Sequence, residues 1–327
     1  MSAVARPRTE HDTLRIGTRA SVLARTQSRL VADRLVAETG AAVELVDVST
    51  RGDVDPAPLA TIGGTGVFVS AVRAALLSGE VDLAVHSLKD LPTAPADEVR
   101  LAAVPVREDP RDVVVARDGL TLGELPAGAT VGTGSPRRAA QLLALGLGLD
   151  VVDIRGNVDT RLRRVRDGDL DAVLLARAGL ARLGRLDEVT EVLDPLQMLP
   201  APGQGALAVE CRADDPVADV VRDVLDDGPS RATVTAERAF LAAVGAGCSA
   251  PVGALAELAW TAGESDEWVP EELWLRGVVV DPTGAPLLRL SATGLPTEPQ
   301  AVGQRLAAEM LDRGAAELIG AARGEPA

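Results

Sequence analysis

The 327-residue sequence has very little lysine, histidine, cysteine or aromatic residue, and each shortage excludes a kind of chemistry. One of the 33 basic residues is a lysine, Lys89; it does not follow a glycine-rich loop, so the P-loop nucleotide-binding motif is absent. The two histidines, His11 and His86, and the two cysteines, Cys211 and Cys248, are widely spaced, so we expect no His/Cys metal site. A Ser-His-Asp triad would have to use one of these histidines. Aromatic residues make up 2%, so the cores must consist of Ala, Val and Leu.

Charge and hydropathy restrict the partners and the compartment. The formal net charge of −15 disfavours general attraction to DNA, RNA or anionic lipid. No run approaches the ~20 apolar residues of a membrane span, and residues 1–12 lack the apolar core of a signal peptide. Two cysteines cannot form a disulfide framework. We therefore expect a cytoplasmic protein that binds neither nucleic acid nor membrane.

The length predicts two or three domains, because typical domains have ~150 residues. Strand and helix patterns alternate from Leu14 to Val85 and again from Asp112 to Ala176, which predicts two parallel α/β sheets. A strand-like segment at 205–211 can return to the first sheet. From about Gly228 a helix, three strands and a last helix predict a smaller α+β domain. The expected domains are residues 11–106 with 204–224, residues 107–203, and residues 228–327.

Polar and basic residues gather where the predicted strands end. In open α/β sheets, ligands bind beyond the carboxyl ends of the strands and at helix N-termini. Arginine forks, hydroxyls and backbone N–H groups together bind carboxylate or phosphate. Arg137 and Arg138 open a helix, where the helix dipole disfavours cations unless an anion lies between them. The segments that predict an anion site are residues 17–21, 86–90, 132–138 and 155–158.

The single lysine stands beside an aspartate in the segment from His86 to Asp90. A lysine kept in an arginine-rich chain suggests a site that needs a compact ammonium, which a planar guanidinium cannot imitate. Lys89 could also carry a pyridoxal Schiff base. Asp90 could cap the turn before Pro92, or it could be an ionised carboxylate that stabilises a cationic intermediate or moves protons.

The two cysteines lie in different local settings. Cys211 ends a strand-like apolar segment and is expected to be a small core residue. Cys248 lies in the glycine-rich segment 245–251, where an exposed reactive thiol is as plausible as a packed one.

Five motifs in order resemble the porphobilinogen deaminase (hydroxymethylbilane synthase) family, from about Leu14 to the C-terminus. They are His86–Pro92, Gly132–Arg138, Arg155–Val158 with Thr160–Arg161, Gly203–Ala206, and Gly247–Cys248. The resemblance implies a transferase that condenses four porphobilinogen molecules head to tail into the linear tetrapyrrole hydroxymethylbilane, with release of ammonia. It implies two doubly wound α/β domains like periplasmic binding proteins, a smaller C-terminal α+β domain, and a monomer.

The resemblance also implies roles for individual residues. Cys248 would carry a dipyrromethane cofactor through a thioether, and Asp90 would be the catalytic carboxylate. Cofactor-binding residues would be Lys89, Ser87, Thr133, Ser135, Arg137, Arg138, Arg155 and Gly205. Substrate-binding residues would be Arg19, Ser21, Phe68, Arg161, Arg182 and Gln204.

The sequence departs from the family pattern at a few positions, and two other classes of protein remain open. Thr65 and Ser70 stand where the family usually has lysine, Pro136 replaces an aliphatic residue, and Gly134 replaces a serine. An anion-binding module could share the two-lobed fold without needing a reactive cysteine. A pyridoxal enzyme could use Lys89.

Overall fold

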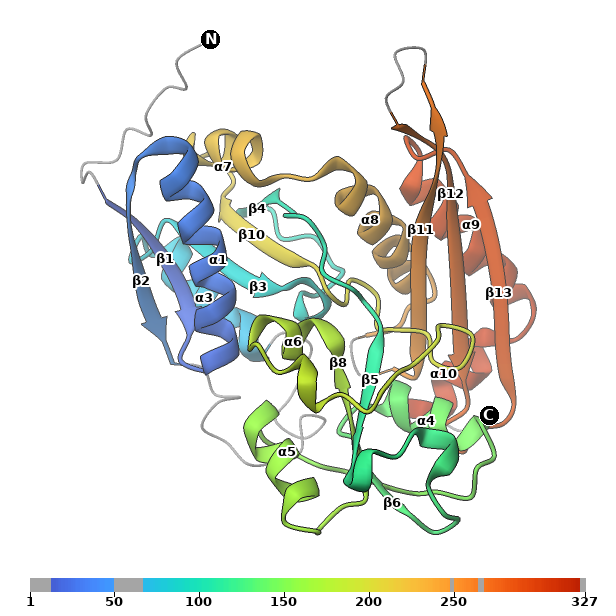
Figure 1. The fold of residues 1–327 in the computed structure, drawn as a ribbon. Helices are drawn as coiled ribbons and strands as arrows, with labels where there is room; N and C mark the ends of the chain where they lie inside the picture. Colours follow the sequence, from blue (N-terminus) through green and yellow to red (C-terminus); the bar gives the residue numbers. More distant parts are fainter. Residues whose placement is uncertain (1–12, 50–66, 248–249, 264–267, 324–327) are drawn as a thin grey trace. The chain divides into compact units, whose positions relative to one another are not determined.

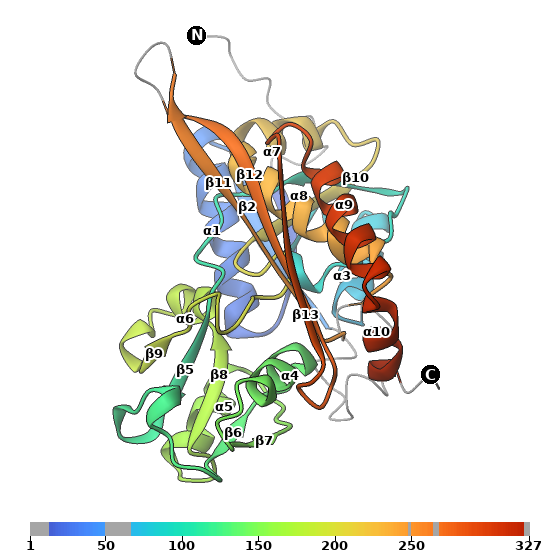
Figure 2. The same ribbon diagram turned by 90° about the vertical axis from the view of Figure 1, so that its right-hand side faces the viewer.

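The computed structural model describes residues 13–49, 67–247, 250–263 and 268–323. The chain divides into two compact units, residues 1–108 with 206–231 and residues 109–205 with 232–327. Figures 1 and 2 show the elements of each unit. Within the described ranges, no helix is both long and apolar enough to cross a membrane.

The first unit contains a five-stranded sheet in the order β2-β1-β3-β10-β4. β1 is parallel to β2 and β3, whereas β10 is antiparallel to both β3 and β4. The expectation of a parallel sheet is therefore wrong for one strand. Strands joined by a crossover helix run parallel, but β10 enters the sheet after a long excursion of the chain, so its direction is not set in this way. The strands are β1 (Thr13–Arg19), β2 (Ala42–Val48), β3 (Leu83–Ser87), β4 (Val99–Ala103) and β10 (Leu207–Arg212).

Helices cover both faces of this sheet. On one face, α1 (Val22–Thr39) and α7 (Val217–Leu225) pack their aliphatic side chains against the strands. On the other face, α3 (Val67–Leu77) packs through Val72 and Leu76 against Val81 of the segment before β3. The sheet is thus doubly wound, with α1 and α7 on one face and α3 on the other.

The second unit contains a sheet of the same design, in the order β7-β6-β8-β5-β9. β6 is parallel to β7 and β8, and β5 is antiparallel to β8, as β10 is to β3. Apolar clusters on both faces confirm the second doubly wound domain. The elements are β5 (Asp112–Ala116), β6 (Thr130–Gly132), α4 (Pro136–Ala144), β7 (Asp150–Val152), α5 (Val158–Arg166), β8 (Ala172–Ala176), α6 (Arg177–Arg182) and β9 (Glu191–Val192).

The same unit contains an antiparallel sheet in the order β11-β12-β13, with helices on one face (Figure 2). Phe240 is fully buried at the centre of its core. The expected single C-terminal helix is two helices, because Gly314 between them adopts a positive φ of 94°. The smaller α+β domain is confirmed. Its elements are α8 (Gly228–Ala243), β11 (Val252–Ala262), β12 (Trp268–Val280), β13 (Leu287–Gly294), α9 (Pro299–Asp312) and α10 (Ala315–Arg323).

Short 3-10 helices complete the chain. The one that matters for the site is η1 (Leu88–Asp90), which follows β3 directly and places Lys89 and Asp90 just beyond the strand end. The others are η2 (Arg117–Gly119), η3 (Leu122–Glu124) and η4 (Leu186–Glu188).

Candidate functional site

A small pocket that is open to solvent lies at the carboxyl ends of β1 and β3 in the first unit. It brings together three residues that the sequence predicts for the site, Arg19, Ser87 and Asp90. The arrangement is the strand-end geometry expected of a doubly wound sheet. The lining residues are Arg19, Ala24, Gln27, Val69, Val85, His86, Ser87 and Asp90.

Local hydrogen bonds fix the edges of this pocket. Ser21 is the N-cap of α1, where its Oγ accepts from the backbone N–H of Ala24 at 3.3 Å. The hydroxyl of Ser87 and the side-chain amide of Gln27 lie 3.1 Å apart and hydrogen-bond. Phe68 belongs to α3, but its side chain lies outside the described residues. Ser21 therefore has a capping role in addition to the predicted substrate contact.

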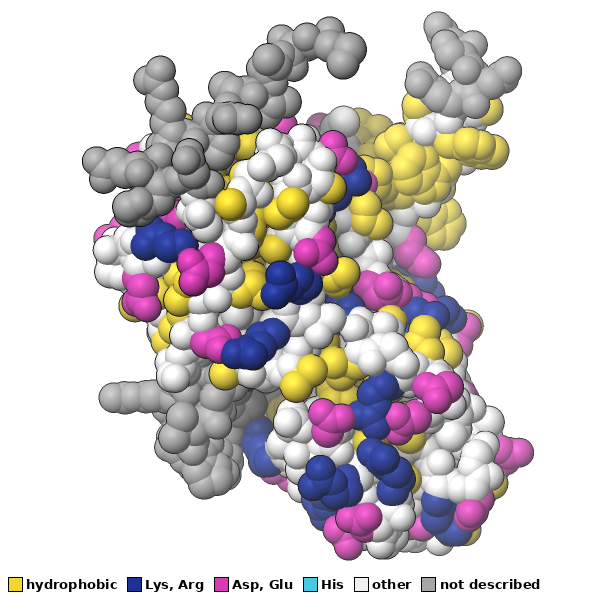
Figure 3. All heavy atoms as spheres, turned by 60° about the vertical axis from the view of Figure 1, so that its left-hand side comes forward, with side chains coloured by type: hydrophobic (Ala, Val, Ile, Leu, Met, Phe, Trp, Pro, Cys, Tyr) yellow, Lys and Arg dark blue, Asp and Glu magenta, His cyan; other side chains and the backbone are white. Residues whose placement is uncertain are grey.

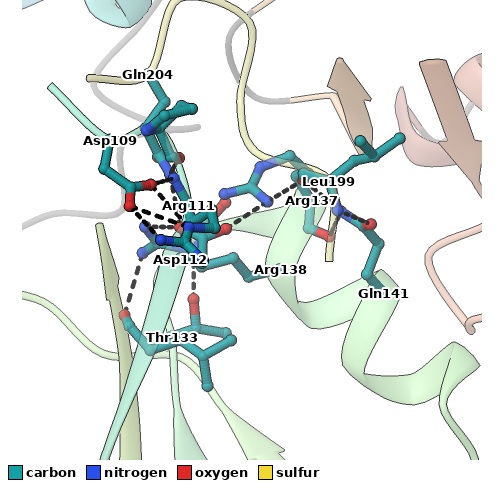
Figure 4. A network of polar contacts seen from close by, with 12 residues as sticks. Asp109, Arg111, Asp112, Thr133, Arg137, Arg138, Gln141, Leu199 and Gln204 are labelled. Atoms are coloured by element: carbon teal, nitrogen blue, oxygen red, sulfur yellow. Dashed lines mark hydrogen bonds and ion pairs between the residues drawn. The ribbon is translucent and has the colours of Figure 1, made fainter. Parts of the chain in front are cut away.

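Arg137 and Arg138 begin α4 and converge on one buried carboxylate, Asp112 at the start of β5 (Figure 4). Arg137 NH1 lies 2.8 Å from Asp112 Oδ2, and Arg138 donates to Oδ1 through NH2 at 2.8 Å and through Nε at 3.1 Å. The anion that the helix dipole requires between two cations is thus supplied by the chain itself. Asp112 was not predicted as a site residue, because nothing in the sequence around a strand residue indicates an ion pair with a distant side chain.

Gln204 belongs to the same network. Its side-chain amide donates to Asp112 Oδ1 and to the carbonyl of Pro110, both at 2.7 Å. Gln141 donates to the Leu199 carbonyl, which also accepts from Arg137 NH1 (Figure 4). The segment after Leu199 is therefore anchored to α4 and β5 by buried polar bonds.

Burial and charge act in opposite directions on Asp112. Complete burial alone would raise its pKa, but the charges and hydrogen bonds of Arg137 and Arg138 outweigh burial and hold the pKa well below its usual range. Burial is also the main cause of the lowered pKa of Arg137. One carboxylate thus stands against two guanidiniums in this cluster, which leaves it positive.

The positive charge extends to the start of α5. Burial, and repulsion from Arg138 and Arg155, lower the pKa of Arg161 to about 10. Arg155 Nε is buried and has no hydrogen-bond partner among the described residues, and it lies 3.5 Å from Asp153. A buried donor whose ionic partner Asp153 is too distant for a good hydrogen bond, in a region of excess positive charge, fits an anionic ligand.

Glycine and asparagine shape the turn that carries these arginines. Asn157 caps α5 by accepting from the Thr160 backbone N–H at 2.9 Å. Gly156 has a φ of 103°, and a Cβ there would lie 2.8 Å from Thr160 Cγ2. Arg161 Nε donates to the Gly156 carbonyl at 2.8 Å. The motif at 155–161 therefore combines a glycine turn and a helix cap that fix the direction of Arg161.

The remaining predicted residues of the second unit lie between β6 and α4, at the end of α6 and in the segment before β10. The backbone N–H of Ser135 donates to Thr133 Oγ1 at 3.2 Å, and Thr133 is buried. Arg182 NH2 donates to the Gly205 carbonyl at 2.6 Å. Of the two cysteines, Cys248 lies outside the described residues. Cys211 is fully buried, and burial raises the pKa of its thiol to about 12, which confirms it as an inert core residue.

Replacing Asp112 by asparagine should destabilise the protein. The change leaves two buried guanidiniums without their carboxylate, for which we expect a loss of about 3–5 kcal/mol in the free energy of unfolding, measured with denaturant. The contribution of Asp112 should persist at neutral pH and disappear only as the pH falls below the ordinary aspartate value of 3.8. The matched control is Asp118→Asn, an exposed carboxylate, with an expected change within about 0.5 kcal/mol. Equal stability of the two variants would contradict the importance of the Asp112 network.

Comparison with known proteins identifies the family. The profile described as "Porphobilinogen deaminase, dipyromethane cofactor binding domain" matches residues 14–219, and "Porphobilinogen deaminase, C-terminal domain" matches residues 231–312. The chain belongs to the porphobilinogen deaminase family. The porphobilinogen deaminase of Mycobacterium marinum (strain ATCC BAA-535 / M) is 58% identical over 306 residues, 94% of this chain and 96% of that protein. The porphobilinogen deaminase of Mycobacterium avium (strain 104) is 57% identical over 314 residues, which cover 96% of this chain and 99% of that protein.

Membership confirms the reaction and the cofactor that the five motifs implied. The chain is a transferase that condenses porphobilinogen into hydroxymethylbilane in tetrapyrrole biosynthesis, and its cofactor is dipyrromethane. The two alternatives, an anion-binding module and a pyridoxal enzyme, are thereby wrong.

Among solved structures, the VFT2 domain of Bordetella pertussis BvgS aligns with a TM-score of 0.42 and 20% identity, over 66% of this chain and 87% of that chain.

Proposed function

We propose that Asp90 is the catalytic carboxylate of this deaminase, that Cys248 anchors the cofactor, and that the arginine cluster of the second unit binds the carboxylates of cofactor and substrate. The observation that carries the proposal is the excess of positive charge at Arg137, Arg138, Arg155 and Arg161, which the carboxylates of Asp112 and Asp153 offset only in part. Each pyrrole unit bears an acetate and a propionate, so the growing chain is a polyanion that requires such a cluster.

Asp90 is proposed to stabilise the substrate cation that forms when the amino group of porphobilinogen leaves as ammonia. When ammonia leaves the aminomethyl group of porphobilinogen, the pyrrole ring becomes a cation. An ionised carboxylate stabilises that cation and accepts hydrogen bonds from pyrrole N–H groups. η1 holds Asp90 at the lining of the strand-end pocket, so the charge has a fixed position before the reaction begins. The same carboxylate can accept the proton lost when the new carbon–carbon bond forms.

The arginines are proposed to bind and orient rather than to react. A guanidinium fork matches a carboxylate in two parallel hydrogen bonds and keeps its proton throughout. Arg137, Arg138 and Arg155, with Lys89, Ser87, Thr133, Ser135 and Gly205, are assigned to the cofactor; when bound, dipyrromethane supplies the pyrrole position that accepts the first substrate. Arg19, Ser21, Phe68, Arg161, Arg182 and Gln204 are assigned to substrate.

Asp112 is proposed to position two of these arginines. Because its carboxylate binds Arg138 through Nε and NH2, it fixes the plane of that guanidinium, and it restrains Arg137 through NH1. The cofactor carboxylates would use the donors that remain. The fit is supported by the positive balance of the cluster and by the network drawn in Figure 4.

The organisation of the protein is part of the proposal. We assign residues 11–106 with 204–224, 107–203 and 228–327 to three domains, of a monomer that works in the cytoplasm. The chain is proposed to bind neither nucleic acid nor membrane, in line with its net charge of −15. On the face drawn in Figure 3, acidic and basic side chains are interspersed over the described residues, so that face presents no broad positive surface.

The mass of the intact protein tests the covalent part of the proposal. We expect the purified protein to exceed its sequence mass by one dipyrromethane, and a limiting amount of porphobilinogen to add a ladder of further pyrrole units. Peptide mapping should locate the adduct in the segment that contains Cys248. A protein with the unmodified sequence mass that still forms product would contradict the proposed anchoring.

A further inference from the structure

A buried charged network adjoins the Asp90 pocket and is used by none of the roles above. Glu210 projects from β10, Arg73 from α3 and His86 from β3. The Arg73 guanidinium donates through Nε to Glu210 Oε2 at 2.8 Å and through NH2 to Oε1 at 2.6 Å. This is a two-bond fork on a carboxylate that is 3% exposed.

The charge state of Glu210 follows from these contacts. Burial alone would raise its pKa, but the hydrogen bonds from Arg73 and His86 and their charges outweigh burial and lower the pKa to about 2. At neutral pH the carboxylate is therefore ionised. An ionised carboxylate has no proton to donate and can serve only as an acceptor.

His86 contacts this carboxylate and also lines the pocket. Its Nε2 is 3.4 Å from Glu210 Oε2, and Nε2 is buried with no hydrogen-bond partner of good geometry among the described residues. The imidazole is 6% exposed, yet it lines the same pocket as Asp90. A lone pair on Nε2 would face the negative carboxylate, whereas an N–H there is attracted to it. The proton of a neutral His86 therefore belongs on Nε2, which leaves Nδ1 as an acceptor.

We propose that the Arg73–Glu210 pair is a positioning device that holds His86 in its Nε2-protonated form, so that Nδ1 serves the Asp90 pocket as a second hydrogen-bond acceptor. This inference rests on the proposed function and deepens it. Porphobilinogen brings donors into the pocket, a pyrrole N–H and an ammonium group. A neutral imidazole accepts from one donor and leaves Asp90 for the other.

The charge balance of the network suits this role. Arg73 neutralises Glu210, so the pair directs the imidazole without adding a second net negative charge to the pocket. The charged groups around His86 come from four elements, Arg73 on α3, Glu210 on β10, Arg19 on β1 and Asp90 on η1. The carboxylate–histidine pairing fixes ring orientation and tautomer, as it does in metal sites and catalytic triads.

Nitrogen-15 NMR of histidine-labelled protein tests the tautomer directly, because the chain has two histidines and His11→Ala identifies the other signal. At mildly alkaline pH we expect His86 to show a protonated Nε2 and an unprotonated Nδ1. A protonated Nδ1, in the other tautomer or in an imidazolium, would overturn the inference. This measurement needs no turnover and no substituted network residue.

Glu210→Gln tests the device itself. We expect this variant to retain the cofactor by mass, to show mixed His86 tautomers, and to lose roughly 10-fold in kcat/KM. The matched control is Asp215→Asn, which removes a carboxylate from Arg212 just beyond the carboxyl end of β10 and should leave the His86 signals unchanged. An unchanged tautomer in Glu210→Gln would show that the pair does not position His86.

Substitutions of His86 distinguish its role as a hydrogen-bond acceptor from a role in packing alone. His86→Leu should lower kcat/KM by roughly 10- to 100-fold, and His86→Asn, which offers an oxygen near the place of Nδ1, should restore part of the loss. Wild-type kcat/KM in His86→Leu would overturn the role. Failure of the proposed function has a different signature, since it would appear as full activity in Asp90→Asn or as a missing covalent cofactor.

Discussion

Cys248→Ser is expected to fold normally, to carry no dipyrromethane and to be inactive. A thiolate is a far better nucleophile than a serine hydroxyl, so serine at this position cannot form the covalent link at a useful rate. Without the link, no primer is held for the first condensation. We expect the intact mass to equal the sequence mass, and turnover to fall below detection.

The matched control is Cys211→Ser. The Cys211 thiol is fully buried in β10, and burial raises its pKa to about 12, so it cannot compete as a nucleophile. This variant should keep the adduct and lose some stability, because a hydroxyl replaces a small apolar group in the core. An adduct found on Cys211, or a loaded Cys248→Ser protein, would overturn the assignment.

The sequence predicted most elements of the fold because their signals are local. Alternation of strands and helices, and the caps at Ser21 and Asn157, are properties of neighbouring residues. Strand direction was the exception. β5 and β10 run antiparallel in otherwise parallel sheets, and that depends on where the chain comes from rather than on the residues of the strand.

The candidate site was predictable to the same degree, and for the same reason. Arg19, Ser87 and Asp90 come together because strand ends of one sheet meet at one edge. The buried carboxylates Asp112 and Glu210 were not predicted, since each reads as a polar residue inside a strand. Their partners lie 25 or more residues away, and only the tertiary fold brings them into contact.

These two carboxylates follow a common pattern. Each is almost completely buried and accepts from an arginine, and each contacts a residue of a proposed site, Arg137 and Arg138 for Asp112 and His86 for Glu210. A buried ion pair contributes little net stability, because desolvation offsets the attraction. The role we infer for each buried pair is to fix the orientation of a side chain that contacts a ligand.

Asp90→Asn should separate binding from chemistry. Asparagine keeps the size of the side chain and part of its hydrogen bonding but removes the charge, so substrate and cofactor should still bind. Turnover should fall by roughly 10²–10⁴-fold, the range for loss of a positioned acid–base or electrostatic group. Mass spectrometry of reactions quenched at successive times gives both the turnover and the distribution of enzyme-bound intermediates.

The expected magnitude follows from the charge of the site. Positive charge develops on a pyrrole at each condensation, while Arg19, which lines the same pocket, makes a cation unfavourable there. Asp90 is the carboxylate that lines the strand-end pocket. Asp90→Glu should be less damaging, because the charge persists and only its position shifts. Since one site serves every addition, intermediates of all lengths should accumulate without preference. Near-normal turnover in Asp90→Asn with the cofactor attached would show that another group stabilises the cation.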